Sequence, residues 1–337
     1  MNSFIDIVLN IFSSGLPCCL LALGIFLTFR LLDFADLTAE GSFLLGAALC
    51  AVMIFNGINP WLATLCSILI GFAAGLITGA LNRYLKIPKL LSGIITMTAA
   101  TSIALIIMGM QNGNNDFIAS QVTFTSLIGK GTPQQTIYSL FYPWKTYWGV
   151  YIVDWPWGEL VKVGVMLGVV IVAMVGIYFF FGTQYGMAIR ATGMNEEMAK
   201  AEGINTNLST LMCVGLSNAL IALAGALYAQ EATTVSLATS SGYLVVGLTS
   251  IIIGETVFGK RSFKNWIISV ALGSIIYYII ITVAITLKLK TQLMSLVYAV
   301  LIVIALSMSL LKAKIQKKIK KHKDAKEDGG LNDARIS

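Results

Sequence analysis

The stretch GMAIRATGMNEEMAKAEGIN, residues 186–205, is a charged, glycine-bracketed segment in a chain that is otherwise strongly apolar. It stands between one charge-free run that ends at residue 189 and another that covers residues 203–230. Both runs exceed the roughly 20 residues that a helix needs to cross the core of a bilayer. The pattern predicts membrane helices on both sides of a short segment that lies in water.

The rest of the chain repeats this pattern. Its 337 residues are 57% hydrophobic and 12% charged, and their mean hydropathy is +0.81, which excludes an ordinary soluble domain. Helices are expected because lipid offers the backbone no hydrogen-bond partners. The apolar segments predict about nine membrane helices, at 5–29, 41–56, 60–83, 91–110, 161–181, 209–230, 241–258, 264–287 and 292–311. Segments 41–56 and 241–258 are the least secure of these spans.

The basic residues predict which side of the membrane each loop occupies. Short cytoplasmic loops are rich in Lys and Arg, and LKAKIQKKIKKHKDAK in the C-terminal tail is the strongest such signal. Counting helices back from a cytoplasmic tail also places 259–264, 182–208 and 82–89 inside. The loop over 111–160, which holds four of the six tryptophans, then lies outside.

An internal repeat organises the chain. A shift of 201 residues lays DLTAEGSFLLGA (36–47) over LATSSGYLVVGL (237–248) and superposes the flanking apolar runs. Because one linking helix separates the two halves, the second half enters the membrane from the opposite face. The predicted fold is an all-α polytopic membrane protein with two inverted four-helix repeats. Its parts are repeat one (5–110), an external loop (111–160), a linking helix (161–181), a cytoplasmic loop (182–208), repeat two (209–311) and a basic tail (312–337).

Each repeat carries the pattern TxxGxxxxG where a short helix begins, and small residues at such breaks favour close packing beside a polar pathway. We expect three residues on one further helix to face the same cavity. The predicted pathway residues are Thr38, Gly41, Ser42, Ser92, Thr96, Thr98, Thr239 and Gly242. Asp36, Glu40 and Glu231 lie beside the breaks, where they are either functional carboxylates in the membrane or interfacial residues.

The segment quoted at the start predicts a helix of about two turns. Asn195 is a typical N-cap, Glu196 and Glu197 follow where the helix dipole favours anions, and Gly203 suits the position after the helix. Lys200 is spaced four residues from Glu196, which favours an ion pair. So short a helix needs a partner surface, and contact with another protein is favoured over a helix resting on lipid headgroups.

The chain shows no energy source or catalytic centre of its own. GETVFGKRS (254–262) has the glycines and lysine of a phosphate-binding loop, but Arg261 stands where such a loop needs Ser or Thr. The lone His322 lies in the tail, and all five cysteines lie in apolar runs, which argues against a metal site or a membrane enzyme. An ATP-driven transporter of this kind would depend on a separate ATPase.

Three stretches carry a resemblance to a known family: FRLLDFADLTAEGSFLLGA (29–47), RYLKIPKLLSGIITMTAATSI (83–103) and the longer run over 186–230. They resemble the branched-chain amino acid and ribose type permeases of bacterial ABC importers. Together with the helix order, the resemblance covers most of residues 5–311. The motif DLTAEGS differs from the sequence that branched-chain amino acid members carry at this position. It is similar to the motif of a branch associated with tryptophan or tyrosine binding lipoproteins.

The resemblance implies a permease in the bacterial plasma membrane, as a homodimer, with two cytoplasmic ATPase subunits and an external solute-binding lipoprotein. ATP and Mg²⁺ would be bound by those ATPases, and this chain would hold no cofactor. The charged helix and the family's coupling pattern together predict the residues that contact the ATPase: Arg190, Met194, Asn195, Glu196, Glu197, Met198, Lys200 and Gly203. The substrate would be a small solute, most simply an amino acid and in particular an aromatic one.

Two further expectations complete the sequence analysis. The basic tail over 312–337 is expected to contact anionic lipid, with no role for nucleic acid. The alternative function is a self-sufficient secondary carrier or channel for a small polar solute, because such proteins use the same inverted repeat. A partner ATPase would distinguish the two functions.

Overall fold

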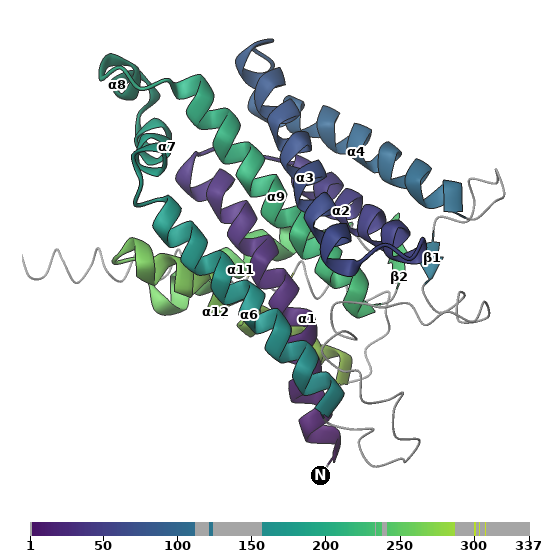
Figure 1. Ribbon diagram of the computed structural model, residues 1–337. Helices are drawn as coiled ribbons and strands as arrows, with labels where there is room; N and C mark the ends of the chain where they lie inside the picture. Colours follow the sequence, from purple (N-terminus) through teal and green to yellow (C-terminus); the bar gives the residue numbers. More distant parts are fainter. Residues whose placement is uncertain are drawn as a thin grey trace, which may run out of the picture.

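The computed structural model describes residues 2–111, 121–123, 157–232, 234–237, 241–286 and the single positions 300, 303 and 307. These residues are almost entirely helical (Figure 1). The helices are α1 (Asn2–Phe26), the π-helix η1 (Leu27–Leu31), α2 (Thr38–Phe55), α3 (Pro60–Arg83), α4 (Lys89–Gln111), α6 (Trp157–Phe180), α7 (Gln184–Met194), α8 (Glu196–Ala201), α9 (Thr206–Ala232), α11 (Tyr243–Phe258) and α12 (Phe263–Thr286).

Seven helices in this part of the chain are long and apolar enough to cross a membrane, and α11 is a shorter apolar helix. The protein is thus an all-α polytopic membrane protein, as the sequence predicts. The expected span over 41–56 begins three residues earlier, at Thr38, and its 18 residues place α2 among the full-length spans. Apart from positions 300, 303 and 307, the span expected over 292–311 lies outside the described residues, as does the basic tail.

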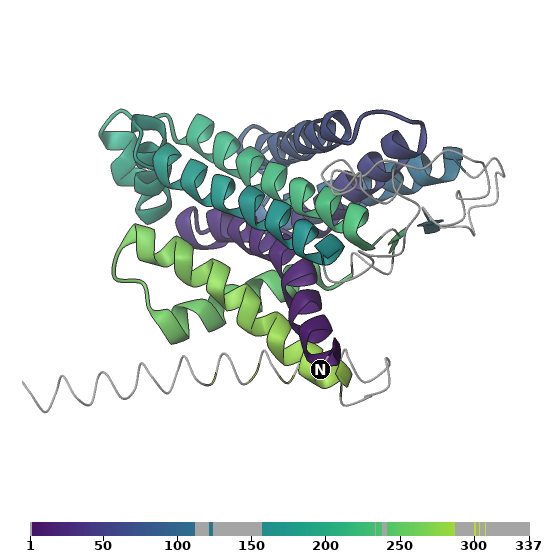
Figure 2. The same ribbon diagram turned by 60° about the horizontal axis from the view of Figure 1, so that its bottom comes forward.

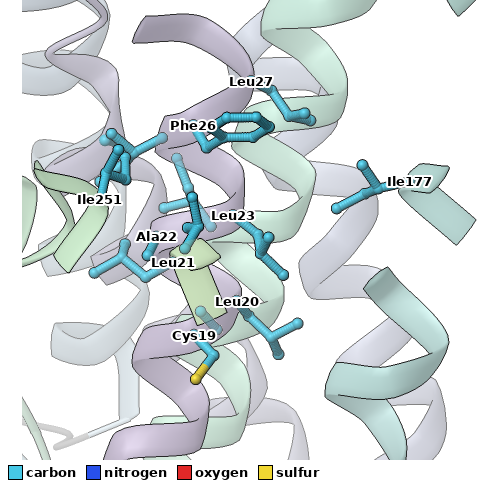
Figure 3. Close-up of a cluster of buried hydrophobic side chains, with 14 of the residues drawn as sticks. Cys19, Leu20, Leu21, Ala22, Leu23, Phe26, Leu27, Ile177 and Ile251 are labelled. Atoms are coloured by element: carbon cyan, nitrogen blue, oxygen red, sulfur yellow. The ribbon is translucent and has the colours of Figure 1, made fainter. Parts of the chain in front are cut away.

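Helices α1 and α9 form the centre of the molecule. In α1 with η1, 89% of the most apolar window is buried, against 17% in α6 and 28% in α4, so α6 and α4 lie at the periphery. Helix α9 packs against α2 and α3, whereas α1 packs against α11 and α12 (Figures 1 and 2). Leu20, Leu23 and Phe26 of α1 lie in the main buried cluster, with Ile177 of α6 and Ile251 of α11 (Figure 3).

Glycines bring α3 and α9 into backbone contact. A Cβ atom added to Gly75 would lie 2.4 Å from the carbonyl oxygen of Val214, and one added to Gly71 would lie 2.5 Å from that of Asn218. Small residues at successive turns are the usual means by which membrane helices pack this closely. Helices α3 and α9 therefore form a tightly packed pair.

The chain breaks its helices where the sequence predicts. After η1 it turns at Asp33, which has a positive φ of 50°, and enters α2 at the buried Thr38. In the second half, Gly242 has a φ of 90° and precedes the first residue of α11. Both TxxGxxxxG segments thus coincide with the start of a helix, although Thr239 itself lies outside the described residues.

A short β ribbon is the only strand pair within the described residues. Gln121–Thr123 (β1) pairs antiparallel with Thr234–Ser236 (β2). Both strands belong to connections between helices, where no apolar periodicity gave a signal in the sequence. The linking helix α6 begins at Trp157, four residues before the expected start at 161.

Candidate functional site

Helices α7 and α8 form a corner whose shape follows from its caps. The Asn195 side chain accepts hydrogen bonds of 3.1 Å from the backbone N–H groups of Glu197 and Met198. At the other end of α8, the N–H of Gly203 donates to the carbonyl of Lys200, and the N–H of Ile204 donates to that of Ala199. This pair of bonds is a Schellman motif, and the φ of 80° at Gly203 explains the glycine.

One face of this corner is exposed. Met194 is 87% exposed and Met198 is 62% exposed, and Glu197 lies at the surface beside them. Ala199 on the opposite side of α8 is buried. The predicted residues on this corner are therefore brought together, with two flexible apolar side chains and a carboxylate directed away from the protein. Such a surface suits contact with another protein.

The charges of α8 hold it to the end of the membrane region. Glu196 pairs with Lys200 at 2.8 Å, as the spacing predicts, and also with the guanidinium of Arg83 at 2.5 Å. Hydrogen bonds from Arg83 and then from Lys200 lower the pKa of Glu196 to about 2. Arg83 also donates a 2.6 Å hydrogen bond to the buried hydroxyl of Thr210 at the start of α9. Arg83, the last residue of α3, thus joins α3 to both α8 and α9.

Arg190 and Gly193 attach α7 to other helices. The Arg190 guanidinium lies 4.7 Å from the centre of the Phe263 ring, at the start of α12. Gly193 lies against the backbone at the end of η1, since an added Cβ would meet the Leu31 carbonyl oxygen at 1.7 Å. Arg190, which the resemblance implied to be a coupling residue, therefore makes a contact inside this chain.

The predicted pathway residues of α2 meet a buried polar cluster. The Thr38 hydroxyl is hydrogen-bonded to that of Thr78 at 2.8 Å, and Gly41 lies against the α4 backbone at Met97. Ser42 is fully buried, and its hydroxyl oxygen has no hydrogen-bond partner in the described part of the chain. The N–H of Gly242 donates to the Glu40 carboxylate at 3.1 Å, so the starts of α2 and α11 meet.

The three predicted residues of α4 lie on two different faces of the helix, and their place on the pathway stays a prediction. Ser92 and Thr96 are buried and lie on the same face, since they are one helical turn apart. Thr98 is exposed, and its hydroxyl donates to carbonyls of its own helix. Two residues along a helix correspond to a rotation of about 200°, which places Thr98 on the other side of α4.

Asp36 and Asn218 form a buried pair that the sequence did not assign to the site. One Asp36 carboxylate oxygen accepts a 2.7 Å hydrogen bond from the Asn218 amide, and the other accepts a 2.9 Å bond from the backbone N–H of Thr38. Both residues are almost completely buried. The available signal was the amide in the middle of an apolar helix, because polar groups at such positions are costly and often functional.

The segment that partly matches a phosphate-binding loop forms the corner between α11 and α12. Glu255 accepts hydrogen bonds from Arg30 at 2.7 Å and from the Trp266 indole at 2.8 Å, and Lys260 lies over the Trp266 ring. An α-helix, α11, precedes this corner, where a phosphate-binding loop would follow a strand. The segment therefore lacks the setting of a phosphate-binding loop, and its interpretation as a basic loop on the cytoplasmic side stays a prediction.

Comparison with known proteins identifies the family. The sequence profile of the branched-chain amino acid transport system permease component matches residues 7–306. The chain belongs to this permease family. The tyrosine transport system permease protein of Clostridioides difficile is 33% identical to this chain. The match covers 85% of this chain and 86% of the Clostridioides protein. The branched-chain amino acid permease protein LivH of Methanocaldococcus jannaschii is 27% identical over 77% of each chain.

Two further likenesses mark the breadth of the family. The fructose import permease protein FruF of Bifidobacterium longum is 24% identical to this chain. The match covers 76% of this chain and 64% of FruF. Among solved structures, PsaBC from Streptococcus pneumoniae in complex with Fab has a TM-score of 0.51 and 14% identity, and covers 92% of this chain and 94% of that one. The latter supports the fold alone. Permeases of this family are membrane components of ABC importers and work with ATP-binding and solute-binding partners.

Proposed function

We propose that this permease is the membrane-spanning subunit of an ATP-driven amino acid importer, energised by a separate cytoplasmic ATPase that docks on α8. The observation that carries this proposal is the α7–α8 corner. It exposes Met194, Met198 and Glu197 on one face, while Arg83 and Glu196 fix its other face to α3 and α9. An exposed helix of six residues held in this way can receive a force and pass it on.

The assembly follows from the family and from the charge distribution. Two ATPase subunits would bind ATP and Mg²⁺ on the side where Arg83 ends α3, Arg190 lies in α7 and Lys264 lies near the start of α12, which would be the cytoplasmic side by the positive-inside rule. A second permease copy would complete a homodimer, and an extracytoplasmic lipoprotein would deliver the solute. The C-terminal tail would lie inside, on anionic lipid.

The packing supports a pathway between two inverted repeats. The first helix of each half packs on the second and third helices of the other half, α1 on α11 and α12, and α9 on α2 and α3. The two halves therefore pack on each other in a similar way, which supports two related repeats with a substrate site at their interface. The pathway would pass the breaks at Thr38 and Gly242, where the helix starts meet through Glu40.

The substrate proposed is an amino acid with an aromatic side chain. The tyrosine transport permease of Clostridioides difficile is 33% identical to this chain, which supports this choice. Beside Glu40, Phe43 stacks on Tyr243 with ring centres 4.2 Å apart, and Tyr228 packs against both rings. These rings pack on one another and Phe43 is buried, so the proposal rests on the likeness to the tyrosine transport permease.

The test is a pull-down of the tagged permease from mild detergent, with partners identified by mass spectrometry. A second form replaces residues 194–203 by Gly and Ser, and elution as a single monodisperse species serves as its folding control. We expect an ATPase to co-purify with the intact chain but not with the Gly and Ser form. A chain that purifies without an ATPase in both forms would support the self-sufficient carrier or channel instead.

A further inference from the structure

Arg83 lies where the proposed ATPase surface meets the membrane helices. It is the last residue of α3, and its side chain is 12% exposed. One guanidinium nitrogen binds Glu196, the first residue of α8, and another binds Thr210 on the first turns of α9. Arg83 is thus bound to α8 on one side and to the α3–α9 pair on the other.

The α3–α9 pair is tightly packed over its length. Gly71, Gly75 and Gly79 are spaced one turn apart on α3 and all face α9. A Cβ at Gly71 or Gly75 would lie within 2.5 Å of an α9 backbone atom. Helices in backbone contact leave little room for sliding, so a displacement at their shared end moves both together.

Deeper in the membrane, each member of the pair holds the segment before α2. Thr78 of α3 is hydrogen-bonded to Thr38 at 2.8 Å, and Asn218 of α9 donates to Asp36 at 2.7 Å. Asp36 in turn accepts from the backbone N–H of Thr38. Named contacts therefore run without a gap from α8 through Arg83 to the buried start of α2.

We propose that Arg83 is a positioning residue that transmits movement of α8 to the Asp36–Thr38 segment during transport. The inference rests on the proposed function, because it assumes that an ATPase moves α8. An arginine suits this role better than a lysine, since its fork reaches two acceptors at once in a fixed geometry. The alternative is a role confined to stability, in which Arg83 only neutralises Glu196.

The test follows the start of α2 in the ATPase-bound complex. A Ser42→Cys reporter places a thiol one turn beyond Thr38, and its maleimide labelling is measured by peptide mass spectrometry with and without ATP and vanadate. This readout needs no transported solute. We expect labelling to depend on nucleotide in the reporter background, and Arg83→Gln to reduce that dependence about fivefold or more while the ATPase still co-purifies.

Two variants act as controls. Lys86→Gln makes the same change of charge three residues away, on an exposed side chain, and should leave the nucleotide dependence intact. The exchange Arg83→Glu with Glu196→Arg should restore part of the dependence lost in Arg83→Gln, which a simple loss of charge balance would not predict.

The outcomes separate the two proposals. Nucleotide dependence that is unchanged in Arg83→Gln would overturn the role of Arg83 and leave the importer standing. The role of Arg83 would also be overturned if the ATPase no longer co-purified with Arg83→Gln. The same holds if labelling in the reporter background were equal with and without nucleotide. A reporter background that recruits no ATPase would refute the proposed function and the role of Arg83 with it.

Discussion

The Asp36–Asn218 pair shows how a buried carboxyl group is hydrogen-bonded at the start of α2. The carboxylate accepts one bond from the Asn218 amide and one from the Thr38 N–H. Asp36→Asn places a donor against a donor, and we expect it to lower the free energy of unfolding by about 1.5–3 kcal/mol. Melting temperatures measured in detergent check this value.

The same pair provides its own control. Asp36→Asn combined with Asn218→Asp reverses the donor and the acceptor. The melting temperature of the double variant should therefore fall by less than the sum of the decreases in the two single variants. A strictly additive result would contradict a direct interaction.

Gly193 holds α7 against η1 because it has no side chain. An added Cβ would lie 1.7 Å from the Leu31 carbonyl oxygen, so Gly193→Ala must separate the two helices. We expect it to destabilise the protein by about 1–3 kcal/mol, as overpacking usually does. Gly176→Ala on α6, where a Cβ has nothing within 4 Å, should be neutral or slightly stabilising in the same melting experiment.

Residues whose partners are local could be predicted from the sequence. The Asn195 cap, the Glu196–Lys200 pair and the glycine after α8 all depend on neighbours within four residues, and the structure confirms them. Arg83 and Glu196 are 113 residues apart, and Asp36 and Asn218 are 182 apart. No periodicity joins such pairs, so these contacts needed the fold.

At the scale of the element, the pH dependence of α8 follows from Glu196. Its pKa falls from an ordinary value of 4.5 to about 2 on folding, so the carboxylate stabilises the folded protein above pH 4.5 and loses this effect toward pH 2. The difference in melting temperature between the parent and Glu196→Gln should be constant from about pH 8 to 5. It should shrink below pH 4.5, whereas a difference that already changes near pH 6 would contradict the assignment.

A change on the exposed face of α8 should remove coupling without loss of stability, whereas a change at the glycine after the helix should reduce both. Glu197→Lys alters the surface alone, so we expect normal membrane insertion and melting but loss of coupling between ATP hydrolysis and transport. Gly203→Pro removes the N–H that bonds Lys200 and cannot adopt a φ of 80°, so it should lose coupling together with some stability. Uptake and ATP hydrolysis measured in parallel check both, and coupled transport by Glu197→Lys would show that α8 is not the docking element.

Element boundaries and faces were predicted unevenly. Apolar length located the membrane helices, because a span such as Ile7–Leu31 is continuously apolar. It could not fix the start of α2, where Thr38 is polar yet buried. The face of α4 was equally hidden, since Ser92, Thr96 and Thr98 have similar polarity and only packing separates Thr98 from the others.

At the scale of the whole molecule, the sequence predicted a polytopic membrane protein of this permease family, and the structure and the family match agree. The repeat itself rests on the shift of 201 residues and on the exchange of partners between α1 and α9. What sequence patterns could not provide is the route between α8 and the start of α2. That route depends on backbone contacts at glycines, which carry no polarity signal.

The central claim is that α8 docks on an ATPase, and the most direct measurement is site-specific photocrosslinking in native membranes. A benzophenone amino acid at Met198 is compared with one at Val172, on the outer face of α6, since the two side chains are 62% and 71% exposed. The account predicts an adduct between the permease and an ATPase subunit from position 198 and none from position 172. Adducts with lipid alone from both positions would contradict it.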